Sequence, residues 1–218
     1  MNKLSNRFKK FGGSYIPDII EYLKEYIELD PGVTISVGCD SIQKRRRTIY
    51  AITIMLYNTD IRRGAHVVFF RDSCTKIRDN QERLYKEAQW VHDVATYLDT
   101  ELSPFYKRKD LSDIERKRYK HHVGICNGQY KHVALHQQDS FVKAIPLGPA
   151  DMMDFKLVDI HVDFNPSEGK SNERGVFQNK SNVAYKSFVP WLRGLGFRTW
   201  AKNVAYASTS AADLLLHD

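Results

Sequence analysis

The sequence predicts an α/β protein organised around one sheet, and two features of the chain indicate this class. Three β-rich runs, at about 33–41, 48–58 and 65–72, follow one another with short connections, which is typical of an antiparallel meander. After them come a long stretch of helical periodicity, a β-rich run, a second helix, a last strand and a closing helix. A meander followed by alternating helices and strands predicts a layered α/β domain.

Composition indicates a globular protein with a preference for polyanions. Hydrophobic residues make up 42% of the 218 residues and aromatic residues 12%, which predicts a packed core and excludes a disordered chain. The length suits one large domain, or a domain with an insert. The net charge of +7 favours a partner such as nucleic acid, although many basic proteins bind no polyanion.

Cysteine usage and the N-terminus predict a cytoplasmic protein. The three cysteines, Cys39, Cys74 and Cys126, form no Cys-x-x-Cys pair, so we expect free thiols in a reducing compartment. The N-terminus carries charges without an apolar core, so it does not resemble a signal peptide. The sequence contains no run of 18 apolar residues, so we expect no contact with a membrane.

The first element is a basic arm over 1–15, which we expect to be loose, followed by a helix that ends near Asp30. Pro17 and Asp18 suit the start of this helix. Its apolar residues fall at helical spacing, which indicates a packing role: Ile16, Ile19, Ile20, Leu23 and Ile27.

Asp40 ends the first strand of the meander. A buried strand that ends in a carboxylate and turns back as a hairpin holds a metal ligand on a rigid element, but the same residue also suits a turn cap. The hairpin that follows carries Lys44, Arg45 and Arg46, which would either contact phosphates or keep the tip solvated.

The long helix, predicted over about 78–101, places a carboxylate beside its apolar stripe. Glu87 lies between Leu84 and Val91 in helical projection, so it faces the core side. A carboxylate there is costly unless it is paired or bound to a cation. The alternative is a boundary position that reaches water or a lysine.

The segment that follows is the most basic part of the chain. Residues 103–146 hold nine Lys or Arg against four Asp or Glu, including Lys117 and Arg118, and tyrosines are interleaved among them. Such a segment contacts a phosphate backbone and stacks bases, or it is a solvated insert. Its histidines and Cys126 match no zinc-ligand spacing, so we predict no zinc site.

A strand over about 156–165 alternates strictly, with Asp159, His161 and Asp163 on one face. These polar residues mark a solvent-facing edge, or they bring Asp163 beside Asp40, where two close carboxylates favour a divalent cation. A polar loop over 166–182, a helix over 181–195, a strand over 197–204 and a short helix that carries Asp213 complete the chain.

Several short motifs occur in a definite order along the chain: Val37-Gly38-Cys39-Asp40-Ser41, Arg83-Leu84-x-x-Glu87, Asp159-x-His161-x-Asp163-x-Asn165, Gly194-Leu195-Gly196-Phe197, and Lys202 followed by Ala207-Ser208-x-x-Ala211-Ala212-Asp213. In this order the chain resembles the ribonuclease H-like fold and, more specifically, the YkuK-type family of ribonuclease H-like proteins. The resemblance implies a mixed five-stranded sheet, with three antiparallel strands and then parallel strands, flanked by helices. It divides the chain into an arm and helix at 1–30 and a domain at 31–218, interrupted by a basic insert at about 103–154.

The resemblance also implies a site and an activity. Asp40, Glu87, Asp163 and Asp213 would be catalytic residues that hold two Mg²⁺ or Mn²⁺ ions for the hydrolysis of phosphodiester bonds in RNA, DNA or a hybrid. His161 would move a proton or position water, or it is a hydrogen-bonded strand histidine. Ser41 and Lys202 would contact a phosphate, and a phage or bacterial origin suits the family.

Two other functions compete with a nuclease. The first is a nucleic-acid-binding protein with the same fold and no catalysis. The second is an ATP-using, actin-like protein, which would need glycine-rich phosphate loops after its hairpins. Only Gly64 stands near such a position, so the sequence disfavours this reading.

Overall fold

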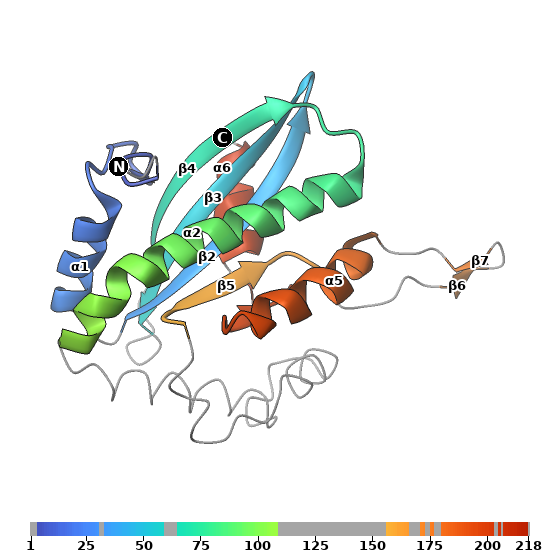
Figure 1. The fold of residues 1–218 in the computed structure, drawn as a ribbon. Coiled ribbons are helices and arrows are strands. Elements are labelled where there is room, and N and C mark those ends of the chain that lie inside the picture. The colour runs from blue at the N-terminus through green and yellow to red at the C-terminus, as the bar shows by residue number, and fades with distance from the viewer. Residues whose placement is uncertain are drawn as a thin grey trace.

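The computed structural model describes residues 4–30, 33–58, 65–108, 156–165, 171–172, 175–176, 180–202, 205 and 207–217. Its main sheet has six strands in the order β1-β4-β3-β2-β5-β8, with α2 and α5 on one face and α6 on the other (Figure 1). The predicted α/β class and mixed sheet are confirmed. The sixth strand, β1, comes from the N-terminal arm.

The N-terminal arm is packed against the sheet, so the prediction of a loose arm was wrong. β1 (Lys9–Lys10) pairs antiparallel with β4, and Phe8 and Ile16 on either side of it are buried. α1 (Ile19–Leu29) follows, with the Asp18 side chain capping its first N–H groups as expected. Lys9 and Lys10 have no strand-forming pattern of their own. Hydrogen bonds to the backbone of β4 order this segment, so the sequence carried no signal for it.

The predicted meander is confirmed and extends further than its hydrophobic runs. β2 (Val33–Lys44), β3 (Arg47–Asn58) and β4 (His66–Thr75) pair antiparallel in unbroken register. In the β2–β3 turn, Arg45 adopts a positive φ of 52°. The basic tip of this hairpin is exposed.

The long helix α2 (Asn80–Arg108) covers the face of β2 and β5. Its predicted stripe is buried, and the helix continues beyond the predicted end into the start of the segment expected as an insert. Asp99 accepts a hydrogen bond from the backbone N–H of Leu157 (2.8 Å) and lies 3.0 Å from the Lys156 ammonium. These contacts fix the beginning of β5 against α2.

β5 (Val158–Val162) lies inside the sheet, which excludes the edge-strand alternative. It pairs in parallel with β2 on one side and with β8 (Thr199–Trp200) on the other. Consequently all five of its residues are buried, the polar ones included. The last strand is shorter than predicted because only two residues pair with β5.

The remaining elements flank the sheet. The predicted polar loop contains a small hairpin, β6 (Ser171–Asn172) and β7 (Gly175–Val176). α5 (Lys180–Gly194) contains Pro190 without a break, and Gly196, at a φ of 89°, follows its end. A π-helix, η2 (Ala207–Ala212), leads directly into α6 (Asp213–His217), and both pack on β2 and β3.

The bulk of the basic segment, 109–155, lies outside the described residues, and with it lie Lys117, Arg118 and the predicted boundary of the insert. No helix in the described part of the chain is long and apolar enough to cross a membrane.

Candidate active site

Asp40 and Asp163 occupy neighbouring positions on two adjacent parallel strands. Cys39 and Val162 are the last residue pair between β2 and β5, and Asp40 and Asp163 follow them in the next row. Cys39 and Val162 point into the core under α2. Because side chains alternate along a strand, both aspartates lie on the opposite face, beside η2 and α6.

Asp213 approaches this pair from α6. It is the first residue of the helix, and its charge raises the pKa of both Asp40 and Asp163. The preceding residue, Ala212, is fully buried in a small apolar cluster with Ala51 of β3. These small side chains bring the start of α6 close to the sheet.

Glu87 reaches the same region from the α2 face. Its side chain is 3% exposed, and Oε1 accepts hydrogen bonds from Ser41 Oγ (2.5 Å) and Arg83 Nη1 (3.0 Å). Burial, and next the charge of Asp40, raise the pKa of Glu87 to about 8, although Arg83 and Ser41 oppose this shift. Glu87 therefore faces the core, as its position in the helical projection predicts.

Arg83 joins α2 to the end of β2, a role that the sequence reasoning did not assign. It donates to the backbone oxygen of Ser41 (2.9 Å), to Ser41 Oγ (2.6 Å) and to Glu87 Oε1. The Asn80 side chain accepts from its Nε and Nη2. Arg83 and Glu87 are four residues apart, the usual spacing of an ion pair on a helix. This spacing was the sequence signal that could have predicted their contact.

The electrostatics of the site favour added positive charge. Burial raises the pKa of Asp40 to about 6, with smaller contributions from Asp163 and Asp213. Burial also raises the pKa of Asp163, while Lys202, whose Nζ lies 3.8 Å from Asp163 Oδ1, lowers it. This Oδ1 atom is buried and accepts no hydrogen bond in the described structure. A buried carboxylate oxygen that faces only an ammonium at this longer distance is a candidate cation ligand.

The donor set fits a hard divalent cation in chemistry, because carboxylate oxygens suit Mg²⁺ and Mn²⁺. However, within the described residues no group of three or more His, Cys, Asp or Glu side chains is arranged to hold a metal ion. Glu87 is held by Arg83, and Asp163 lies beside Lys202.

The other two polar residues of β5 have structural partners. His161 is buried, and its Nδ1 accepts the backbone N–H of Ala207 (3.1 Å), which ties η2 to the sheet. Burial lowers the pKa of His161 to about 4, so the ring is neutral at pH 7. Asp159 accepts hydrogen bonds from Arg198 Nε (2.6 Å) and Trp200 Nε1 (3.0 Å).

The residues predicted to contact phosphates are separated in the structure. Lys44 Nζ donates to the backbone oxygen of Leu216 (2.9 Å), which links the hairpin to α6, whereas Arg45 and Arg46 are exposed at its tip. Ser41 is buried, and its hydroxyl group donates a hydrogen bond to Glu87 and accepts one from Arg83. Lys202 lies beside Asp163, so in the described part of the chain it and Ser41 are the residues of this set that touch the carboxylates.

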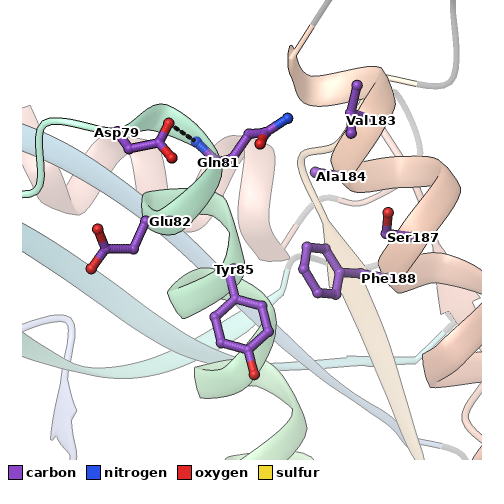
Figure 2. A pocket seen from close by; sticks show the side chains of 8 residues that line it. All are labelled: Asp79, Gln81, Glu82, Tyr85, Val183, Ala184, Ser187 and Phe188. Carbon is purple, nitrogen blue, oxygen red and sulfur yellow. Dashed lines mark hydrogen bonds between the residues drawn. The ribbon is translucent and has the colours of Figure 1, made fainter.

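A pocket opens between the start of α2 and α5, on the side of the sheet that carries Glu87. Figure 2 shows the rings of Tyr85 and Phe188 facing each other, with Asp79 and Glu82 at the margin. The two carboxylates make this pocket unfavourable for a phosphate group.

The chain combines an antiparallel meander with a strand, β5, that is parallel to β2, and it carries carboxylates at these two strands and on two helices. This combination defines the ribonuclease H-like class of α/β proteins. A family model described as Ribonuclease H-like matches residues 16–127, slightly more than half of the chain, and the chain belongs to this family. The match includes Asp40 and Glu87 and ends before β5. No curated protein and no solved structure matches the chain. Membership of the family indicates a function that involves nucleic acid.

Proposed function

We propose that the protein is a metal-dependent nuclease that hydrolyses phosphodiester bonds, with Asp40, Asp163, Asp213 and Glu87 as the residues that hold Mg²⁺ or Mn²⁺. The observation that carries the proposal is the row shared by Asp40 and Asp163. The two carboxylates are half-buried on neighbouring strands, and burial, followed by the charge of Asp163, raises the pKa of Asp40. Two carboxylates in this arrangement favour a divalent cation between them.

The bound ions would supply an activated water and stabilise the leaving oxygen. The chain's own residues divide the remaining work. Arg83 and Ser41 hold Glu87 through its Oε1, and no described residue donates a hydrogen bond to its Oε2. Lys202 neutralises part of the charge of Asp163 and serves as a phosphate contact beside it. The burial of His161 and its bond to Ala207 favour a positioning role, because a shuttle must exchange protons with water.

A non-catalytic nucleic-acid-binding protein is the alternative. The observation that favours it is the pairing of Glu87 with Arg83 and of Asp163 with Lys202, since fixed cations already compensate two of the four carboxylates. In this case the acidic residues would stabilise the fold, and metal would have no effect on binding.

Cleavage assays with wild-type protein and an Asp40→Asn variant separate the two functions. Labelled RNA–DNA hybrid, RNA, single-stranded DNA and a four-way junction are incubated with Mn²⁺ or with chelator. We expect metal-dependent cutting that Asp40→Asn abolishes without unfolding the protein and that Asp93→Asn, a change of an exposed carboxylate on α2, leaves intact. A fully active Asp40→Asn protein would refute the site, and binding that persists in chelator without any cutting would support the alternative.

A further inference from the structure

A groove of about 480 Å³ lies between the N-terminal arm and β4, away from the carboxylates and unused by the proposed chemistry. Three cations and several aromatic rings line it, and no carboxylate does so among the described residues. Its central residues are Lys9, Phe11, Tyr15, Phe69 and Arg71. This combination differs from the pocket of Figure 2, where Asp79 and Glu82 accompany the aromatic rings.

The groove is a built feature, because the arm is a pinned hairpin. The backbone N–H of Lys10 donates to Ser14 O (2.9 Å), and that of Ile16 donates to Phe8 O (2.9 Å). Gly13, at a φ of 88°, makes the turn at the tip. Phe8 and Ile16 are buried at the base, so the hairpin holds Phe11 and Tyr15 in fixed positions above β4.

The aromatic rings of the hairpin are accessible to a ligand. Phe11 is 47% exposed and Tyr15 is 66% exposed, although each is a large ring on an ordered element. The Phe11 ring meets Phe69 at a centroid distance of 6.1 Å, and the Lys9 ammonium lies 4.3 Å from the centre of the Tyr15 ring. Exposed rings beside cations are the elements with which proteins stack bases and bind the backbone of a single strand.

The groove and the carboxylates share one face of the sheet. Asp40 pairs with Ala51, and Ala51 pairs with Arg71, so Arg71 lies in the row of Asp40 two strands away, at about 10 Å. Leu215, which lines the groove, is two residues after Asp213 on α6. Ala51, between Arg71 and Asp40 in this row, is covered by η2 and α6, so a strand of nucleic acid that joins the groove to Asp40 would run over α6.

We propose that this groove binds an unpaired stretch of nucleic acid, with bases stacked on Phe11 and Tyr15 and phosphates at Lys9 and Arg71. The stretch continues toward Asp40, which places the scissile bond a few nucleotides away. The proposal deepens the proposed nuclease function and rests on it for the direction of the strand, whereas binding itself does not depend on catalysis.

Binding is measured in chelator, so that cleavage plays no part. The probe is a fluorescein-labelled oligothymidylate of about 12 nucleotides, followed by fluorescence anisotropy. We expect Phe11→Ala and Tyr15→Ala each to weaken binding by about tenfold or more, the range for loss of one stacked base. Trp191→Ala, at an exposed aromatic residue of α5 outside the groove, should bind as wild type does. Unchanged affinity in both hairpin variants would overturn the proposal.

Salt dependence distinguishes stacking from charge. We expect the aromatic variants to keep the wild-type slope of log affinity against log salt concentration, whereas Lys9→Gln should reduce that slope by about 0.7. A merely unfolded hairpin would remove stacking and phosphate contacts together. An aromatic variant that loses slope as well as affinity would therefore contradict the assigned roles.

Photo-crosslinking tests the site without any substitution. An oligonucleotide that carries 5-iodouracil is irradiated with the wild-type protein, and the crosslinked peptide is identified by mass spectrometry. We expect crosslinks at Phe11 or Tyr15, and crosslinks confined to other segments would overturn the proposal. Hairpin-dependent binding without cutting would refute the nuclease function alone, whereas cutting with wild-type binding in both aromatic variants would refute the groove alone.

Discussion

Replacing Glu87 with glutamine is expected to change how the stability of the protein depends on pH. Glutamine keeps the shape of the side chain and an acceptor oxygen for Ser41 and Arg83, but it cannot ionise. The pKa of Glu87 is raised from 4.5 to about 8 in the folded protein, chiefly by burial. The substitution therefore removes one titration from the folded state and leaves the hydrogen bonds in place.

The sign of the effect follows from proton binding. A carboxyl group whose folded pKa is raised holds its proton when the unfolded chain has already lost it, so its contribution to stability is full below about pH 4.5 and is lost as the pH rises through about 8. With these two pKa values, Glu87 lowers the free energy of unfolding of the wild type by about 4 kcal/mol between pH 5 and pH 9. Asp40, with a pKa of about 6, adds a smaller fall in the same direction.

Urea unfolding at several pH values in chelator measures this difference. We expect the wild type to lose stability steadily from pH 5 to pH 9 and the Glu87→Gln variant to lose much less, so that the variant is the more stable protein at pH 9. Glu82→Gln, at an exposed position of the same helix, is the control and should follow the wild-type curve. Parallel curves for the wild type and Glu87→Gln would refute the assignment of a buried, protonated Glu87.

Three further substitutions test contacts that hold the site and the fold. Arg83→Met should destabilise the protein by about 3–5 kcal/mol at pH 9, where it leaves Glu87 charged and unpaired, and by less at pH 5; urea unfolding at both pH values gives this difference. Arg198→Met should cost a similar amount at neutral pH, because Asp159 is 5% exposed; a loss below 1 kcal/mol in a chemical melt would contradict the buried pair. Phe8→Ala should cost about 3 kcal/mol and should increase amide hydrogen exchange in the N-terminal hairpin before other segments, whereas uniform exchange would argue against a separately anchored hairpin.

The spacing of apolar residues along the chain predicted the elements that depend on contacts between neighbouring segments. The meander, the long helix and the inward side of Glu87 follow from alternation and from helical spacing, so they were visible in the sequence. The sequence predicts the closeness of Asp40 and Asp163 as one of two alternatives, although β2 continues past Asp40 to Lys44 and is longer than predicted. The parallel register of β2 and β5 is the observation that places the two aspartates next to each other.

Long-range contacts explain what the sequence did not predict. The strand β1 exists because the backbone of β4 accepts it, and its two lysines carry no β signal. Asp159 was predicted to be one of the residues on a solvent-facing edge, because its partner Arg198 lies far along the chain and leaves no local signal. η2 is attached to β5 by the backbone N–H of Ala207, which donates a hydrogen bond to His161. A bond from a backbone group leaves no pattern in the sequence.

The parallel pairing of β2 with β5 has a consequence for the order of folding. The meander, the N-terminal hairpin and α2 involve neighbours in the chain, so they can form early, whereas β5 must close a long loop before it pairs with β2. Asp40 and Asp163 lie at the end of this pairing between β2 and β5. A newly made chain would therefore form the meander first and bring Asp40 and Asp163 side by side only after β5 has paired with β2.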